Sequence, residues 1–232
     1  MSEQPPIRHF AIIRFGKTGR TRFLSHLDLA RAVDRAVRRA VLPVKYSEGF
    51  NPSAQIGYAS ALPVGTAAEA EPCQIELTRP MPADEIHRAL AAELPEGITL
   101  ADTRVVSGPR RKHISGSEIA EYEIELDASG APCVEALRQG VQELLDAGEL
   151  MVLRETKSQT REIDVRPGIQ ELSVVEPRSE EAGPRIRMTL ALQQDKLVKP
   201  SEVIEWLERR LFGLTGRDVR LDVRVVTRLG LR

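Results

Sequence analysis

The stretch "SHLDLARAVDRAVRRAVLP" (Ser25–Pro43) predicts an amphipathic helix whose two faces differ in chemistry. Ser25 can cap this helix, and Asp28 follows three residues later in a capping-box pattern. Because Pro43 disfavours helical geometry in the preceding residue, we expect the helix to end near Leu42. At roughly 100° per residue, one side is apolar and suited to packing on a sheet. That side carries Leu29, Val33, Ala36, Val37 and Ala40.

The segments around this helix predict a repeating order of elements. "IRHFAIIRF" (Ile7–Phe15) is rich in β-branched and aromatic residues and reads as a strand. Downstream, strands are expected at "AQIGYASAL", "CQIELT" and "ITLADTRVV", with a second helix at residues 83–94. The first half therefore predicts the order strand, helix, strand, strand, helix, strand.

The second half predicts the same kind of unit. Strands are expected at "IAEYEIEL", "ELMVLRET", "TREIDVR", "PRIRMTLALQ" and "DVRLDVRVVTRL", and helices at "VEALRQGVQELLDAG" and "PSEVIEWLERRLFG". We therefore predict an α+β chain of two tandem ferredoxin-like (βαββαβ) domains with antiparallel sheets. The domains are expected at residues 1–108 and 118–232, joined by a basic linker at 109–117.

Composition narrows the classes of protein that the chain can belong to. Of its 232 residues, 41% are hydrophobic and 29% charged, and the net charge is -1, so an acidic ligand has to be met by a local patch. No apolar run approaches the about 20 residues of a membrane span, and the N-terminus lacks a secretory signal pattern. Cys73 and Cys133 provide no disulfide framework. These features predict a cytoplasmic protein without a membrane partner.

Cofactor motifs are absent from the sequence. There is no G-x-x-x-x-G-K-[ST] loop and no G-x-G-x-x-G after a strand. The four histidines have no metal-ligand spacing with each other or with the cysteines, and no three-cysteine cluster occurs. We therefore expect the chain itself to hold no cofactor and no metal.

The polar side of the Ser25–Pro43 helix is a candidate binding surface. It carries Arg31, Arg35, Arg38 and Arg39. The segment between Arg20 and Phe50 contains seven lysines or arginines and three acidic residues. Arginines at this helical spacing can follow a phosphate backbone, because each guanidinium is a planar, permanently charged group of donors. A solvated helix face has the same pattern.

The loop that follows, "KYSEGFNPSAQIGYAS" (residues 45–60), combines a lysine with aromatic rings and turn residues. Lysine beside exposed rings can pair a phosphate with a stacked base, as in proteins that bind single-stranded nucleic acid. Rings in such a loop can equally fill the core under the sheet. The candidate binding residues here are Lys45, Tyr46, Phe50 and Asn51.

Two further features are weaker candidates. The linker "GPRRKHI" adds Arg110, Arg111 and Lys112 to the proposed nucleic-acid surface, although a solvated linker needs the same composition. His26 stands outside the arginine face, in the first turn of the helix. It is a candidate general base for a ribose hydroxyl, and otherwise a structural, half-buried histidine.

The stretch "RTRFLSHLDLARAVDRAVRRAVLPVKYSEGFNP", with "ALPVGTAAEAE" after it, resembles a bacterial family of unknown function, the radical SAM-linked (radical SAM-associated) proteins. The match runs from Arg22 to Glu71, and Ser53-Ala54 stand where the family pattern usually has His-Pro. The resemblance implies a separate radical SAM protein as partner, which holds the iron–sulfur cluster. A second likeness, in architecture and in a histidine near the first helix, is to the tandem ferredoxin-like endoribonucleases that process CRISPR repeats.

These observations favour a non-catalytic accessory protein that binds RNA and works with a radical SAM enzyme. The helix arginines, the loop and the linker would form one contact surface. Two alternatives stay open: a metal-independent endoribonuclease that uses His26, and a protein–protein adaptor whose arginines meet an acidic partner.

Overall fold

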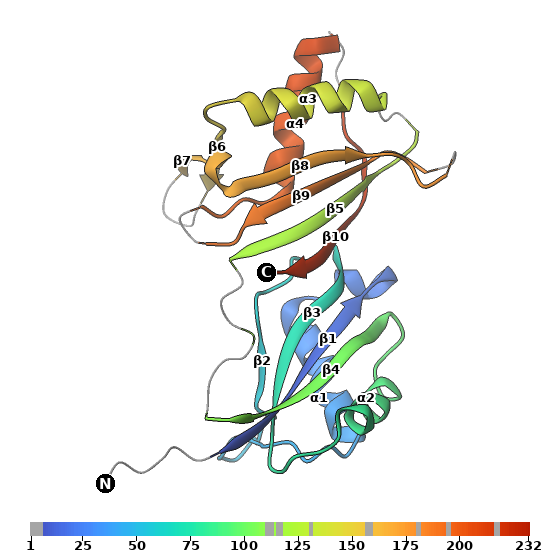
Figure 1. Cartoon of the computed structure of the whole chain (residues 1–232), viewed down its shortest axis with the longest axis vertical. Helices are drawn as coiled ribbons and strands as arrows, with labels where there is room; N and C mark the ends of the chain where they lie inside the picture. Colours follow the sequence, from blue (N-terminus) through green and yellow to red (C-terminus); the bar gives the residue numbers. More distant parts are fainter. Residues whose placement is uncertain are drawn as a thin grey trace. The chain divides into compact units, whose positions relative to one another are not determined.

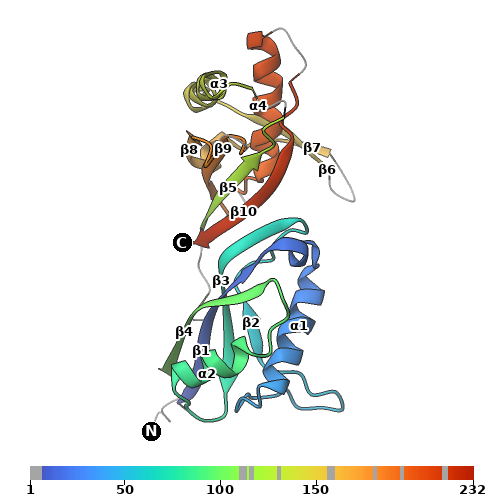
Figure 2. The same cartoon turned by 90° about the vertical axis from the view of Figure 1, so that its right-hand side faces the viewer.

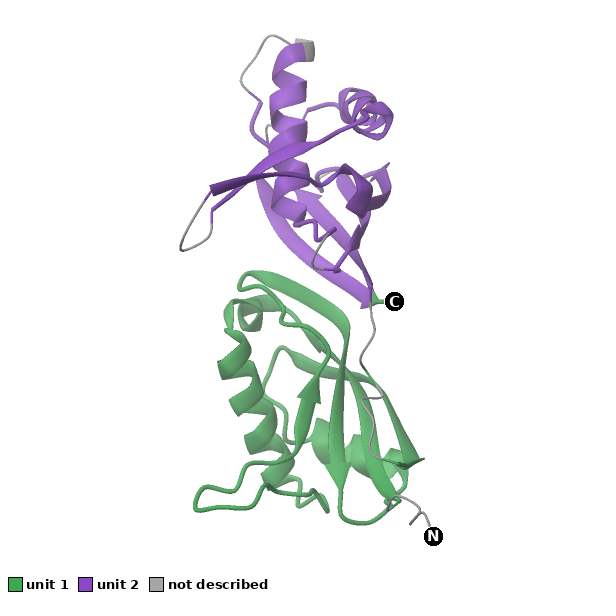
Figure 3. Ribbon diagram, turned by 90° about the vertical axis from the view of Figure 1, so that its left-hand side faces the viewer, with its two compact units in different colours: residues 1–117, 231 green, residues 118–230, 232 purple. Residues whose placement is uncertain are grey.

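The structure is a computed structural model that describes residues 7–109, 114, 118–129, 132–155, 160–179, 182–193, 196–215 and 219–232. The described residues form four α-helices and ten strands, and the prediction of a chain of helices with mostly antiparallel strands is confirmed (Figure 1). The chain divides into two compact units, residues 1–117 with 231 and residues 118–230 with 232 (Figure 3). Within the described residues, none of the helices combines the length and apolar composition that a bilayer crossing requires.

Unit 1 is built from four strands, two α-helices and one 3-10 helix. In chain order these are β1 (Arg8–Lys17), η1 (Gly19–Phe23), α1 (His26–Arg39), β2 (Ile56–Tyr58), β3 (Thr66–Leu77), α2 (Ala83–Ala91) and β4 (Ile98–Gly108). The strands lie in the order β4-β1-β3-β2, and each neighbouring pair is antiparallel.

The core of unit 1 lies between α1, α2 and one face of this sheet (Figure 2). Alternate residues of a strand share a face, and the face of β1 and β3 that packs on the helices is apolar. The sheet supplies Ala11, Ile13, Phe15, Cys73, Ile75 and Leu77, and the helices supply Leu29, Val33, Ala36, Val37, Ile86 and Leu90. The apolar side predicted for α1 is therefore buried, with Ala40 half-buried at the end of the helix.

Unit 2 contains β5 (Ile119–Leu126), α3 (Val134–Asp146), β6 (Met151–Glu155), β7 (Thr160–Asp164), η2 (Arg166–Gly168), β8 (Ile169–Val175), β9 (Arg185–Ala191), α4 (Pro200–Thr215) and β10 (Val223–Leu231). Its main sheet has the order β10-β5-β9-β8, and β6 and β7 form a separate two-stranded sheet. Setting β6 and β7 aside, the strand order along the sheet is the same as in unit 1.

Three details of the predicted strands were wrong. β2 covers only Ile56–Tyr58, whereas β3 begins at Thr66 and continues through Pro72, ahead of the strand expected from Cys73. A proline removes one ladder donor and occurs in sheets at edges or bulges, and Pro72 lies close to the register shift between Phe15 and Lys17 of β1. β8 was not predicted, although Ile169 and Leu172 are buried in it. The strands expected at "ELMVLRET" and "TREIDVR" form, but they pair with each other and not with the main sheet.

Candidate nucleic-acid interface

The predicted cap places the first turn of α1. The Ser25 hydroxyl accepts a hydrogen bond from the Asp28 amide at 3.2 Å and donates one to the Asp28 carboxylate at 2.7 Å. The helix ends at Arg39. Two residues later, Val41 adopts a left-handed backbone with φ of 51°. This short, well-bounded helix presents its arginines along one exposed side.

Two of the four arginines on α1 are used within the unit. Arg38 donates to the Asp34 carboxylate at 2.8 Å and to the Pro52 carbonyl oxygen at 2.9 Å. Its guanidinium also lies over the Tyr46 ring, 4.9 Å from the centroid. Arg39 pairs with Glu93 at 2.7 Å, beyond the end of α2. The hydrogen bond to Asp34 raises the pKa of Arg38, and both guanidinium charges are offset by local acids.

The other two arginines are better placed to meet a ligand. Arg31 is exposed, and its ion pair with Asp28 is long, at 3.4 Å. Arg35 is exposed and has no hydrogen-bond or ion-pair partner among the described residues. Arg38 and Arg39 thus make contacts within unit 1, whereas Arg31 and Arg35 are open to solvent.

The loop after α1 is a small hairpin. An isolated bridge joins Tyr46 to Ala54, and the Ser47 amide donates to the Ser53 carbonyl oxygen at 2.8 Å. The Ser47 hydroxyl in turn accepts from the Ser53 amide at 3.0 Å. Gly49, with φ of 122°, makes the turn at the tip, a conformation that side chains disfavour. Asn51 is exposed in this tip.

The aromatic residues of the loop have different positions. Tyr46 and Tyr58 are half-buried against the core of unit 1, and Tyr58 makes an edge contact with Phe15, with ring centroids 6.5 Å apart. Phe50 at the hairpin tip is fully exposed, at 106% of its reference area. Of the rings considered for base stacking, the structure therefore leaves Phe50 accessible and uses the two tyrosines mainly for packing.

Lys45 points to a carboxylate. Its ammonium donates to Glu76 Oε1 at 3.1 Å, and Arg8 donates to the same oxygen at 2.8 Å. Burial raises the pKa of Glu76, but the hydrogen bonds from Lys45 and Arg8 outweigh it, and the net pKa is lowered. Glu76 is thus ionised at neutral pH and meets two cations, which leaves one positive charge in excess at this edge of β3.

A groove of about 400 Å³ runs between α1 and the segment that leads into β2. Its lining combines apolar side chains with two guanidiniums, one carboxylate and two hydroxyl-bearing side chains. The lining residues are Leu27, Ala30, Arg31, Asp34, Arg35, Ser53, Ala54, Ile56 and Tyr58. Leu27, which lines this groove, is 66% exposed. This groove, which we call the α1 groove, can accept a flat apolar group beside an anion.

His26 packs against a ring. Its imidazole makes an edge contact with Tyr58, with centroids 5.2 Å apart, and it is half-buried. Within the described part of the chain, no side chain forms a hydrogen bond or ion pair with it. General-base catalysis usually needs a second group that orients the imidazole, so this geometry supports packing.

Tyr58 itself carries an unusual feature. Its hydroxyl is buried and has no hydrogen-bond partner among the described residues. Burial is the main cause that raises its pKa well above the usual range. The neutral phenol therefore serves as part of the wall between the groove and the core.

The linker candidates and the possibility of a metal site complete the set of sequence predictions. Arg110, Arg111 and Lys112 lie outside the described residues. Across the part of the chain that the structure describes, no three His, Cys, Asp or Glu side chains gather as a metal ion would require.

The α1 groove was not predicted as a unit from sequence. Leu27 and Ile56 were each visible as apolar residues, but their meeting depends on how β2 lies against α1. The usable signal was that Leu27 falls outside the apolar side of the helix. A second missed feature is Arg22, whose guanidinium lies 4.7 Å from the ring centroid of Phe23, itself 57% exposed, just before α1.

The chain was compared with protein families, curated proteins and solved structures. The model of a family described as "Uncharacterized protein conserved in bacteria (DUF2344)" matches residues 11–200. No curated protein matches. Among solved structures, the chain is similar to one named "Crystal Structure of a Cbf5-Nop10-Gar1 Complex", with a TM-score of 0.50 and 10% identity. That match covers 95% of this chain and 48% of the other, so this chain spans about half its length, and the likeness concerns the fold alone.

Proposed function

We propose that this chain, which belongs to the bacterial family DUF2344, is a non-catalytic accessory protein that binds RNA in the α1 groove and works with a separate radical SAM enzyme. The observation that carries the proposal is the pairing of Arg31 and Arg35 with an apolar groove wall. Single-stranded RNA offers flat bases and phosphates next to each other, and proteins hold it by apolar or aromatic contact together with cationic side chains.

The groove, with a volume of about 400 Å³, offers an apolar wall beside two guanidiniums, and its carboxylate, Asp34, is bound by Arg38. The apolar wall formed by Leu27 and Ile56 suits a base face, and Arg35 has no ion-pair partner among the described residues. Phe50 on the nearby hairpin supplies an exposed ring for a second base. Arg38 takes another role in this proposal, because its donors hold the hairpin to α1.

The partner and the fold name are also parts of the proposal. The resemblance of the Arg22–Glu71 stretch to radical SAM-linked proteins supports the enzyme partner. The shared strand order of the two sheets supports two ferredoxin-like units in tandem. Two free cysteines, Cys73 and Cys133, support a reducing cytoplasm as the place of action.

The test of RNA binding compares two double variants that remove the same charge. Fluorescence anisotropy with a labelled oligoribonucleotide is measured over a range of salt concentrations. For Arg31→Ala with Arg35→Ala, we expect roughly tenfold weaker binding or more, and a salt slope smaller by about 0.7 for each phosphate that is no longer neutralised.

The control is Arg88→Ala with Arg209→Ala, which removes two exposed arginines that pair with acids of their own helices. Arg88 pairs with Asp84 on α2 at 3.2 Å, and Arg209 pairs with Glu205 on α4. This control should bind RNA as wild type does. Unchanged binding by Arg31→Ala with Arg35→Ala, or an equal loss in the control, would refute the proposal.

Three further outcomes bear on the alternatives and on the enzyme partner. Cleavage of the RNA by wild type in EDTA, abolished in His26→Ala, would make the chain an endoribonuclease. Capture of the radical SAM partner by the full chain, unaffected by nuclease treatment and by Arg31→Ala with Arg35→Ala, would show that the enzyme binds another surface. Failure of the enzyme to bind with or without RNA would remove the partner from the proposal.

A further inference from the structure

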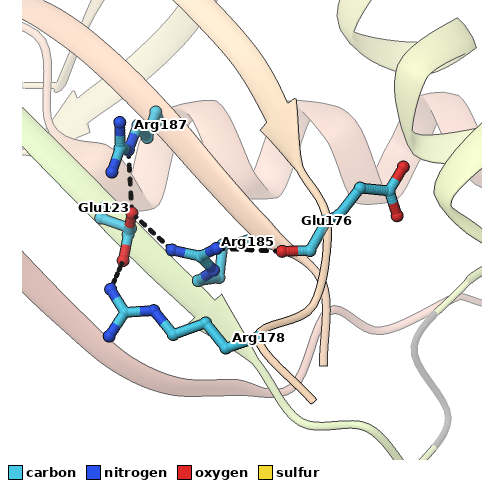
Figure 4. Close-up of polar contacts among 5 residues, drawn as sticks. All are labelled: Glu123, Glu176, Arg178, Arg185 and Arg187. Atoms are coloured by element: carbon cyan, nitrogen blue, oxygen red, sulfur yellow. Dashed lines mark hydrogen bonds and ion pairs between the residues drawn. The ribbon is translucent and has the colours of Figure 1, made fainter. Parts of the chain in front are cut away.

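Three arginines converge on one glutamate in unit 2 (Figure 4). Arg187 Nε and Arg185 Nη1 donate to Glu123 Oε2 at 2.8 and 3.0 Å, and Arg178 Nη2 donates to Oε1 at 2.8 Å. Glu123 belongs to β5, Arg185 and Arg187 to β9, and Arg178 to the segment after β8. Because Glu123 lies opposite Arg187 in the antiparallel ladder, these side chains share one face of the sheet.

The charges of this cluster are unbalanced, unlike those of neighbouring ion pairs. Glu125 is met by Arg224 at 3.0 Å, and Glu121 is met by Arg232. Glu123, by contrast, meets three guanidiniums. Burial raises its pKa, but the hydrogen bonds from Arg187 and Arg185 outweigh burial and lower the pKa overall, so the carboxylate is ionised at neutral pH. Among the described residues, two positive charges therefore remain without a counter-charge in the cluster.

Some N–H groups of the two exposed arginines have no partner among the described residues. A guanidinium carries five N–H groups in a planar fork. Arg187 uses only Nε, its side chain is 53% exposed, and its two terminal nitrogens have no partner among the described residues. Arg178 is 66% exposed and uses only Nη2 within the same part of the chain. Both can reach a ligand from solvent without giving up Glu123.

Arg185 gives the cluster a rigid base. Its side chain is 11% exposed, and Nη2 donates to the Glu176 carbonyl oxygen at 3.0 Å while Nη1 holds Glu123. Its Nε is buried and has no hydrogen-bond partner within the described residues. Glu123 and Arg185 thus hold each other in place, and the two exposed arginines extend from this fixed pair.

We propose that Arg178, Arg185 and Arg187 form a phosphate-binding site, with Glu123 as the internal counter-ion that positions them. A phosphate group carries up to two negative charges and several acceptor oxygens, which matches the two surplus charges and the open forks. The phosphate comes either from the backbone of a nucleic acid or from a small molecule with a terminal phosphate. The site belongs to unit 2 and does not depend on the α1 groove.

The test uses the full chain and inorganic pyrophosphate as the probe, titrated calorimetrically in a phosphate-free buffer at low salt. We expect saturable binding that weakens by roughly tenfold in Arg187→Gln and in Arg178→Gln, since each removes a charge-assisted hydrogen bond. The matched control is Arg224→Gln, which removes the same charge from a one-to-one pair with Glu125 and leaves binding unchanged. Absence of saturable binding, or an equal loss in the control, would overturn the site.

A competition experiment identifies the source of the phosphate. An oligoribonucleotide without terminal phosphates that displaces pyrophosphate from wild type supports a site for backbone phosphates. Pyrophosphate binding that this RNA leaves untouched supports a site for a terminal or free phosphate. In both cases, the double variant Arg31→Ala with Arg35→Ala should bind pyrophosphate as wild type does. The proposal of RNA binding in the α1 groove and the proposal of this phosphate site can therefore fail independently.

Discussion

Arg38 on α1 and Pro52 in the hairpin that follows are joined by a hydrogen bond of 2.9 Å from the guanidinium to the proline carbonyl oxygen. The same side chain holds Asp34 on its own helix and covers the Tyr46 ring. One arginine thereby connects the helix to both sides of the hairpin. The four arginines of α1 therefore differ in their contacts, and Arg38 is engaged within unit 1.

Replacement of Arg38 by alanine should loosen the hairpin. The amides of Ser47 and Ser53 bond only within the hairpin, so their hydrogen exchange reports its opening. We expect exchange of both amides to become roughly tenfold faster, the effect of losing a charge-assisted hydrogen bond. Arg35→Ala serves as the control and leaves both rates unchanged. Equal rates in Arg38→Ala and wild type would show that Arg38 does not hold the loop.

Replacement of Val41 by glycine should stabilise unit 1. Val41 is 85% exposed and adopts φ of 51° just after the end of α1, a position where helices favour glycine. The left-handed backbone costs an ordinary residue roughly 1–2 kcal/mol. Glycine regains part of this and loses some through its freer unfolded chain, so the free energy of unfolding should rise by about 0.5 kcal/mol. Urea unfolding measures the change, and a decrease would contradict the strained geometry.

The ion pair between Arg154 and Glu202 should give unit 2 a pH-dependent stability. Arg154 donates to both carboxylate oxygens of Glu202, at 2.7 and 2.8 Å, and the Lys199 amide donates at 2.8 Å. Burial raises the pKa of Glu202, but these bonds outweigh it and lower the pKa overall. A group with a lowered folded-state pKa stabilises above its unfolded pKa and loses this contribution as the pH falls.

The expected outcome concerns wild type and Glu202→Gln. At pH 7 wild type should be more stable by about 2 kcal/mol, because the variant leaves Arg154 without its charge partner. The difference should shrink as the pH falls below about 4.5 and the carboxylate of wild type is protonated. Urea unfolding from pH 7 to pH 3 measures it. A difference that stays constant over this range would show that the ionised pair adds nothing.

Two glycines of unit 2 should respond in opposite ways to alanine. A Cβ on Gly140 in α3 would lie 3.6 Å from Leu207 and 3.7 Å from Leu211 of α4, ordinary contact distances. Gly140→Ala should therefore stabilise by about 1 kcal/mol, the difference in helix propensity. A Cβ on Gly168 would lie 2.1 Å from the Lys196 carbonyl oxygen, so Gly168→Ala should destabilise by about 2 kcal/mol. Unfolding curves that change in the same direction would contradict this packing.

Phe50→Ala should separate binding from stability. The ring is fully exposed at the hairpin tip, so its removal should leave the free energy of unfolding unchanged. If the ring stacks on a base, RNA affinity should fall by about 1–3 kcal/mol, the range for one base–aromatic contact. Phe50→Tyr is the matched control and should retain binding. Full affinity in Phe50→Ala would remove this ring from the RNA surface.

Local features of the fold could be predicted from the sequence, whereas pairings between distant segments could not. The cap at Ser25 and the apolar side of α1 depend on residues within one or two turns, and both occur as predicted. The separate pairing of β6 with β7, and the place of β8 beside β9, depend on partners chosen in space. Their sequences have strand character in either arrangement, so periodicity alone could not distinguish the two.

The candidate site shows the same limit. The arginine side of α1 was predictable from helical spacing. The acidic partner of Arg39 was not, because Glu93 lies beyond α2 and far along the chain. The rings of Tyr46 and Tyr58 could have faced solvent or the core, and the structure places both against the core. Whether the remaining arginines bind RNA stays a prediction.

The β6–β7 hairpin lies outside the main sheet of unit 2, between α3 and β8 along the chain, and the ion pair of Arg154 with Glu202 connects it to α4. Its loss or lengthening would break no hydrogen bond of the β10-β5-β9-β8 ladder. Without it, the order of elements in unit 2 repeats that of unit 1. We therefore expect relatives to differ in length first in this hairpin, at residues 151–164.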